Sequence, residues 1–322
     1  MCKTWADQVE KLDHVDVIDA RSGILHLTEA FAAFVVIALS YNGGKIVCKA
    51  AVEQAGGRYT TQSPAECGPY RFAAWDQTQT VTLTANPDWA GPKPAFWTVE
   101  FSSMGDDQAA QLAQLADAFE VTRLAVSAIT QLKAAMPLGA SPIQAQTTRY
   151  ARLTNTIPAE PLKDLRVRHA IQYAYDGEAV LLGAHDGLAV RSTGVVPPTG
   201  PFTRATNLIA TRDVEQAKAL LAQAWVSDLT LHLVAVTDST TKAMAQIIQA
   251  SLAEAGITVE LQPTQDAAYW SLGDQTAGEG YKSLDLALMN FAGGIDPTDN
   301  LVWFRPDQIG VYHWSFFDSI EF

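Results

Sequence analysis

The sequence predicts an α/β fold built from two domains. Residues 229–233 place leucine at every second position, which is typical of a strand with one buried face. Residues 240–255 have the apolar spacing of a helix, and residues 257–261 return to a strand pattern. A strand–helix–strand unit of this kind joins two parallel strands. The apolar segment 284–289 predicts a further strand, and 322 residues with 48% apolar content suffice for two hydrophobic cores.

The other elements are recognised from apolar segments separated by turn residues. We expect strands at 15–19 and 24–27 around a Ser22-Gly23 turn, a buried helix at 29–39, strands at 81–84 and 97–101, and helices at 106–119, 162–182 and 214–225. Asp213 is a suitable N-cap for the last of these helices. Gly256 is a suitable cap at the end of the helix at 240–255.

Charge and composition exclude several classes of protein. The chain carries 22 basic and 35 acidic residues, a net charge of −13. This balance argues against a nucleic-acid binder, which needs a basic surface to displace counterions, and against attachment to anionic lipid. The longest apolar segment, residues 30–39, is about half the length that spans a bilayer. Three cysteines are too few for a disulfide framework, although a bridge between Cys48 and Cys67 stays open.

No catalytic or metal-binding motif is present in the sequence. It lacks a G-x-S-x-G elbow, a P-loop and an H-E-x-x-H pair. The six histidines, at positions 14, 26, 169, 185, 232 and 313, are scattered, with no pair at ligand spacing along the chain. We therefore expect a protein that is not an enzyme and that uses no cofactor and no metal. An α/β enzyme would need a catalytic cluster that these patterns do not supply.

Several blocks occur in an order that resembles a known family. Residues 67–72 read CGPYRF, Trp75 follows, and residues 86–94 read NPDWAGPKP. Residues 163–174 read KDLRVRHAIQYA, and residues 246–257 read QIIQASLAEAGI. This ordered set resembles the family 5 extracellular solute-binding proteins, which serve peptide- and nickel-type ABC importers. Cys67 stands where the family usually has threonine, and the turn at 86–94 is one residue shorter than in the family.

The resemblance implies a periplasmic-binding-protein-like two-lobe fold, of the type II peptide-binding cluster. Residues 1–102 would form an incomplete first lobe, and residues 103–322 a second α/β lobe lacking its C-terminal continuation. The chain has no export signal at its N-terminus, so we expect an internal piece of such a protein. Members of the family are periplasmic or extracellular, and this location is expected by resemblance.

The resemblance also implies a function. The chain would be the substrate-binding component of an ABC importer, capturing a peptide-like or other small solute between two lobes and delivering it to a membrane permease. The partners would be that ligand and the permease, with no nucleic acid. The alternative is a truncated, non-transporting paralogue or fragment with an incomplete cleft.

Ligand-binding residues are expected among aromatic and polar side chains near strand ends and loops, because aromatic walls give a binding cleft large apolar contact at little entropic cost. The expected set is Tyr41, Asn42, Trp270, Asn290, Phe291, Asp296, Trp303 and Trp314. The peptide-binding branch uses an Asp in the loop of residues 293–300 to pair with the ligand's α-ammonium group. Here Gly293 and Gly294 precede Ile295 and the spacing is one residue short, so Asp296 is a candidate substitute for that role. The other interpretation is an Asp-Pro turn in which Asp299 caps the next helix. We expect Trp75, Trp89, Trp97 and Trp225 to serve packing.

Overall fold

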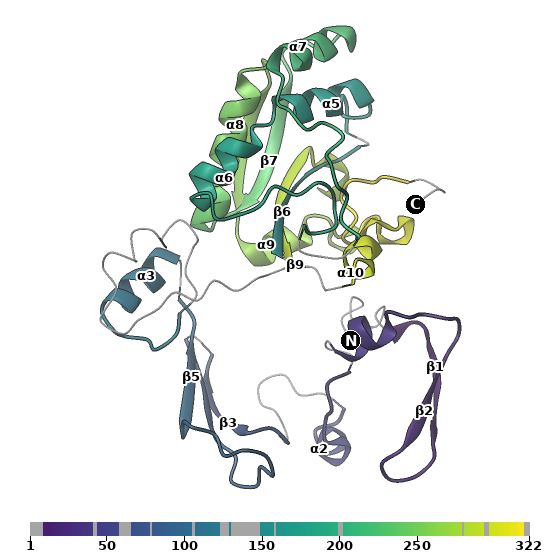
Figure 1. The fold of residues 1–322 in the computed structure, drawn as a ribbon, viewed down its shortest axis with the longest axis vertical. Coiled ribbons are helices and arrows are strands. Elements are labelled where there is room, and N and C mark those ends of the chain that lie inside the picture. The colour runs from purple at the N-terminus through teal and green to yellow at the C-terminus, as the bar shows by residue number, and fades with distance from the viewer. Residues whose placement is uncertain are drawn as a thin grey trace. The chain divides into compact units, whose positions relative to one another are not determined.

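The chain forms two compact units in a computed structural model, Met1–Gly105 and Asp106–Phe322 (Figure 1). The structure describes residues 9–40, 44–57, 66–77, 79–104, 107–122, 129, 149–157, 159–198, 202–278, 280–292 and 296–318. None of the helices within these ranges is both long and apolar enough to cross a membrane.

The first unit contains two antiparallel sheets. Strands β1 (Leu12–Val17) and β2 (Gly23–Leu27) form a hairpin. Strands β3 (Tyr70–Asp76), β4 (Thr80–Ala85) and β5 (Thr98–Ser102) form a three-stranded meander. Strands β2, β4 and β5 confirm those expected at 24–27, 81–84 and 97–101. Strand β1 begins three residues and ends two residues before the strand expected at 15–19, and β3 was not expected. A short helix, α2 (Lys49–Gln54), follows Cys48, which is an exposed free thiol like Cys67, so the two residues form no bridge.

The prediction of a helix at 29–39 is wrong over its first half, because only Val35–Leu39 forms regular helical structure. A turn precedes this segment, in which the Phe34 amide donates to the Phe31 carbonyl. Phe34 is buried, whereas Val35 is 63% exposed. The expected apolar face of Phe31, Phe34 and Val35 is therefore not formed as one buried stripe.

The expectation that four tryptophans serve packing is wrong as well, because each is at least 36% exposed. These residues are Trp75, Trp89, Trp97 and Trp225. Trp225 is the extreme case at 93% exposed. It follows the end of α7 (Val214–Gln223) with a positive φ of 58°, and this left-handed conformation directs the chain away from the helix.

The second unit is organised around a four-stranded sheet with the order β6-β9-β7-β8. Its strands are β6 (Arg149–Asn155), β7 (Thr230–Val236), β8 (Thr258–Thr264) and β9 (Leu286–Ala292). Strand β7 pairs in parallel with both β8 and β9, whereas β6 pairs with β9 in the antiparallel direction. The parallel β7–β8 pair confirms the strand–helix–strand unit, with α8 (Ser239–Ala253) as the crossover helix.

Alternate residues of the central strands enter two different cores. Leu231, Leu233, Leu286 and Leu288 belong to the larger core, which includes residues of α5 (Leu165–Ala174), α6 (Gly177–His185), α7 and α8. Val234, Ala287 and Met289 belong to a smaller core with Tyr269 of α9 (Asp266–Ser271) and Trp314. Helices α5 to α8 thus cover one face of the sheet, and α9 covers the other (Figure 1). The apolar run at residues 286–289 of β9 follows from burial on both faces.

The single helix expected at 162–182 is two helices. Tyr175 has extended backbone angles and ends α5, and the Asp176 side chain accepts a hydrogen bond from the Ala179 amide to start α6. An Asp after an apolar helical stretch competes with helix continuation because it caps a new first turn. The Asp213 cap expected for α7 is confirmed by its bond from the Gln216 amide, at 2.8 Å.

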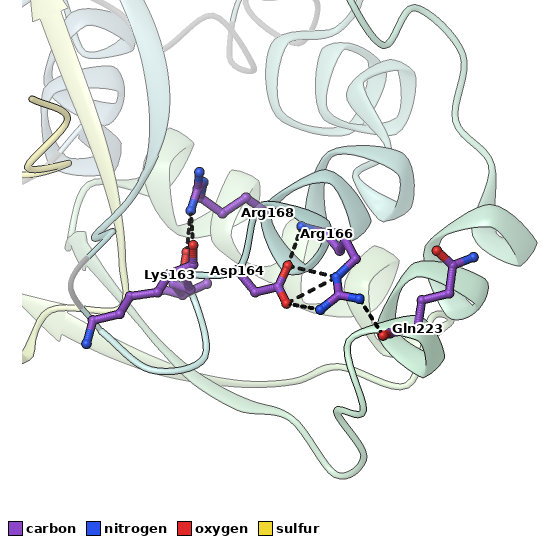
Figure 2. A network of polar contacts seen from close by, with 6 residues as sticks. Lys163, Asp164, Arg166, Arg168 and Gln223 are labelled. Atoms are coloured by element: carbon purple, nitrogen blue, oxygen red, sulfur yellow. Dashed lines mark hydrogen bonds and ion pairs between the residues drawn. The ribbon is translucent and has the colours of Figure 1, made fainter. Parts of the chain in front are cut away.

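The start of α5 is held by the charged group shown in Figure 2. The Asp164 carboxylate accepts from the Arg166 amide at 2.8 Å and from its Nε at 3.0 Å. The same guanidinium donates to the Gln223 carbonyl at the end of α7, at 2.6 Å, and so links the two helices. Hydrogen bonds from Arg166 lower the pKa of Asp164 to about 2. Arg168 donates to the carbonyls of Leu162 and Lys163.

Candidate functional site: an aromatic cluster at the strand ends

The aromatic side chains expected in the second unit gather where its parallel strands end. Trp270 lies in α9, which begins two residues after β8, and Phe291 is the penultimate residue of β9. Trp303 lies in the short helical turn Val302–Phe304, after α10 (Thr298–Leu301). Open α/β sheets bind ligands beyond the carboxyl ends of their strands, so this edge is where a binding surface is expected.

Four partly exposed rings form a closed circuit at this edge. Trp270 meets Phe291 at a centroid distance of 6.2 Å, and Phe291 meets Trp303 at 5.8 Å. Trp303 meets Tyr312 at 5.1 Å, and Tyr312 returns to Trp270 at 6.2 Å. All four contacts are edge-to-face, the geometry that the ring quadrupoles favour. We call Trp270, Phe291, Trp303 and Tyr312 the aromatic circuit.

Trp314 lies in the smaller core beneath the surface of the aromatic circuit, packs against Trp270, and is not itself part of that surface. Its side chain is 1% exposed, and it packs between Tyr269 at 5.1 Å and Trp270 at 6.3 Å. Its indole donates to the Val311 carbonyl at 3.2 Å. A β-carbon at Gly273 would overlap the Trp314 ring, so this approach requires glycine. The expected ligand contact of Trp314 is thus not available, because no ring surface remains to meet a ligand.

The segment that carries Tyr312 and Trp314 is fixed to the sheet beyond the end of β6. The Thr156 hydroxyl donates to the Trp314 carbonyl at 3.1 Å, and the Ile157 amide donates to the Ser315 carbonyl at 3.0 Å. The Thr156 amide donates in turn to the Asp285 carbonyl, just before β9. These bonds place Tyr312 beside residues of α9 and β9 that are distant from it in sequence.

Polar groups accompany the circuit. The Trp270 indole donates to the Asp266 carboxylate at 3.2 Å. The Trp303 indole nitrogen and both side-chain amide atoms of Asn300 are buried without a hydrogen-bond partner among the residues that the structure describes. Buried donors and acceptors of this kind are costly in the interior unless a partner is supplied. The cluster therefore combines apolar ring surface with a small number of polar groups, as binding surfaces for small molecules do.

Asp296 occupies a capping position. Its carboxylate accepts from the Thr298 amide at 2.9 Å, in the first turn of α10. The expectation that Asp299 caps this helix is wrong, because Asp299 lies inside α10 and Asp296 makes the bond that was assigned to it. An ionised carboxylate has further acceptor capacity, so this bond does not preclude a second partner.

The remaining expected residues differ in their placement. Asn290 precedes Phe291 in β9, and because successive strand side chains alternate, it points to the opposite face of the sheet. Its amide donates to the Thr241 hydroxyl of α8 at 2.7 Å. Tyr41 and Asn42 lie outside the described residues. Tyr312 is the one circuit member that was not expected, although the density of aromatic residues over 303–317 is a signal that points to this segment.

Comparisons with known proteins agree with the fold. The family model described as "Bacterial extracellular solute-binding proteins, family 5 Middle" matches residues 4–308. The protein named "Probable D,D-dipeptide-binding periplasmic protein DdpA" of Escherichia coli (strain K12) is 25% identical over 322 aligned residues, covering 95% of this chain and 60% of that protein. The glutathione-binding protein GsiB of Salmonella choleraesuis (strain SC-B67) is 25% identical over 306 residues, covering 93% of this chain and 57% of that protein.

The solved structure of the ABC transporter-associated periplasmic binding protein DppA from Helicobacter pylori, in complex with the peptide STSA, superimposes with a TM-score of 0.79 at 20% identity. The match covers 98% of this chain and 62% of that chain, and it confirms the expected fold class. The chain thus spans between 57% and 62% of the length of these three relatives. All three are named as binding proteins and none as an enzyme. The match over residues 4–308 shows that the chain belongs to family 5 of the bacterial extracellular solute-binding proteins.

Proposed function

We propose that this chain captures a peptide-like or other small solute as the substrate-binding component of an ABC importer, and that the aromatic circuit of the second unit is part of its binding surface. The observation that carries the proposal is the circuit itself. Four rings from separate segments meet at the carboxyl edge of the sheet, where the fold favours a ligand. Such rings offer contact area at low entropic cost because few torsions must be fixed.

Charge indicates which kind of solute fits. Asp266 and Asp296 contribute carboxylates to the segments that carry the circuit, and the chain has a net charge of −13. A ligand with a positive group, such as the α-ammonium of a peptide, would complement them. Asp296 is the residue that we propose for this contact.

The proposal extends to the rest of the transport cycle through family membership. Residues 1–102 would belong to the first lobe and residues 103–322 to the second, with Tyr41 and Asn42 contributing from the first lobe. The partner would be a membrane permease, and the protein would act outside the cytoplasmic membrane. It would perform no chemistry on the solute, since the circuit offers binding groups and not a nucleophile paired with a base.

The test is ligand-induced stabilisation of the 322-residue chain, measured by thermal melting with di- to pentapeptides, glutathione and sugars. A ligand at a hundredfold excess over Kd adds about 2.7 kcal/mol to the stability of the folded state. The melting temperature should rise saturably with one ligand class. Trp270→Leu and Trp303→Leu should abolish the rise, while Trp225→Leu should retain it, because Trp225 is 93% exposed and lies outside the circuit.

The second candidate is that the chain is a truncated, non-transporting paralogue or fragment with an incomplete cleft. One observation favours it. Large apolar side chains of the first unit are exposed, among them Ile46 at 87%, Trp97 at 68% and Phe101 at 60%. Exposed large apolar side chains can promote association. A cooperative melt with no ligand shift, together with self-association in analytical ultracentrifugation, would favour this candidate over solute capture.

A further inference from the structure

The β1–β2 hairpin of the first unit brings together two histidines that are separate in the sequence. His14 of β1 lies directly opposite His26 of β2, and Asp16 follows His14 by two residues in the same strand. Because side chains at i and i+2 share one face of a strand, His14, Asp16 and His26 project from the same face. Val15 and Leu25, which also pair, lie on the other face.

The side-chain atoms on this face already lie at ligand separations. His26 Nε2 is 2.8 Å from Asp16 Oδ2, and His14 Nε2 is 3.8 Å from Asp16 Oδ1. One ligand atom from each residue can be chosen so that all lie within 4.8 Å of one another. Metal–ligand bonds of about 2.0–2.2 Å in a tetrahedral site place neighbouring ligand atoms about 3.3–3.6 Å apart. The observed separations bracket that value. Because the two imidazole rings lie nearly parallel, one ring must turn out of the stack so that both nitrogen lone pairs meet at one ion.

The imidazole of His14 is oriented by a second carboxylate. His14 Nδ1 is 2.9 Å from Asp13 Oδ2, and the two imidazole rings are stacked at a centroid distance of 4.3 Å, inclined by 7°. A carboxylate that accepts from one ring nitrogen fixes the proton there and leaves the lone pair of the other nitrogen for a metal. Asp13 thus leaves His14 Nε2 facing Asp16, which is the arrangement that a metal-binding histidine requires.

We propose that His14, Asp16 and His26 bind one divalent transition-metal ion across the β1–β2 hairpin. Two imidazoles and one carboxylate favour borderline ions such as Zn²⁺, Ni²⁺, Co²⁺ and Cu²⁺ over Mg²⁺ and Ca²⁺, which prefer oxygen ligands. The three side chains are 54%, 59% and 40% exposed, so water or an exchangeable ligand completes the coordination.

Binding would have a structural consequence for the hairpin. A two-stranded hairpin is marginally stable in water by itself, and β1 pairs only with β2 among the strands that the structure describes. An ion held by residues of both strands binds the hairpin when the strands are paired and not when they are separated. Binding therefore stabilises the paired hairpin by mass action.

The test is isothermal titration of the 322-residue chain with Zn²⁺, in a background in which Cys2, Cys48 and Cys67 are replaced by serine so that no thiolate competes. We expect one ion per chain. Asp16→Asn and His26→Gln should each weaken binding at least about tenfold. His232→Gln is the matched control, since His232 also lies near two carboxylates, Asp285 at 2.8 Å and Glu260 at 3.5 Å. Within the described part of the chain, His232 belongs to no metal-binding group of the kind that His14, Asp16 and His26 form.

A second readout separates loss of ligands from loss of fold. In the same background, Cu²⁺ should give an electron paramagnetic resonance spectrum with nitrogen couplings from two imidazoles, reduced to one in His26→Gln. Asp16→Asn is nearly isosteric and exposed, so its metal-free melting temperature should match the parent. Unchanged Zn²⁺ affinity in the His14→Asn/His26→Gln double variant would overturn the proposal, as would loss of binding in His232→Gln alone.

Discussion

The side-chain amide of Asn290 donates a 2.7 Å hydrogen bond to the hydroxyl of Thr241, and this bond joins the end of β9 to the first turn of α8. Thr241 is completely buried, and its amide also donates to the Asp238 cap of the same helix. The Asn290 side chain is thus committed to the sheet–helix contact on the face opposite the aromatic circuit. A structural role accounts for it.

Asn290→Ala should destabilise the second unit by about 1–3 kcal/mol, because it leaves the buried Thr241 hydroxyl without its partner. Thr241→Val should cost a similar amount, and the double variant should cost less than the sum of the two. Urea unfolding of the four proteins measures this coupling. Additive costs in unfolding free energy would show that the bond between Asn290 and Thr241 contributes nothing. If Asn290→Ala lost ligand binding without losing stability, Asn290 would instead be a ligand-binding residue.

Tyr269 anchors α9 beneath the aromatic circuit. It is 0% exposed, and its hydroxyl donates to the Leu288 carbonyl at 2.9 Å. Tyr269→Phe keeps the ring and should cost about 1 kcal/mol for the lost bond. Tyr269→Ala should cost about 3–5 kcal/mol because it opens a cavity between α9 and the sheet. Chemical denaturation gives both values, and equal costs for the two variants would contradict this separation of ring packing from hydrogen bonding.

The local sequence pattern predicts the elements of the second unit well. Alternating leucines, an amphipathic helix and Gly256 specify β7, α8 and β8 because each signal lies within one short window. The break between α5 and α6 was not predicted, since Asp176 reads equally well as an exposed helix residue. The extended backbone of Tyr175 and the bond from the Ala179 amide to Asp176 show that a new helix begins there.

Residues that meet across the fold are harder to predict. Trp270, Phe291 and Trp303 were expected from their position near strand ends, and the structure brings them together. Tyr312 joins them only because Thr156 and Ile157 bind its segment, a contact over more than 150 residues of sequence. His14 and His26 show no ligand spacing along the chain, because the register of the hairpin sets their pairing.

Asp164 should make stability depend on acid pH. Hydrogen bonds from Arg166 lower its pKa to about 2, so the folded state binds fewer protons there than the unfolded state does. The resulting stabilisation is present above the ordinary pKa of aspartate, near 4, and is lost as the pH falls toward about 2. Asp164→Asn keeps a capping oxygen but removes the charge.

The melting temperature of the wild type should therefore exceed that of Asp164→Asn at neutral pH and approach it as the pH falls toward about 2. Asp164→Ala should melt lower than both at neutral pH because the cap is lost as well. Circular dichroism melts across this range measure the difference. A gap between wild type and Asp164→Asn that stays constant with pH would exclude the charge as its source.

His185 should make stability depend on pH in a second window. It ends α6, its Nε2 lies 3.4 Å from the Met244 sulfur of α8, and desolvation lowers its pKa below the ordinary value. A lowered histidine pKa means that the unfolded state takes up a proton before the folded state does. Stability is thus fully present above the ordinary histidine pKa and is lost as the pH falls through the folded value.

His185→Leu removes this proton uptake and keeps an apolar side chain against Met244. The free energy of unfolding of the wild type should fall relative to His185→Leu as the pH drops below the ordinary histidine pKa, about 6.5. Urea unfolding at several pH values measures the difference in unfolding free energy between the two proteins. The other five histidines are present in both proteins, so their contributions cancel in this difference. If His185→Leu runs parallel to the wild type, desolvation at the α6–α8 contact does not hold this imidazole neutral.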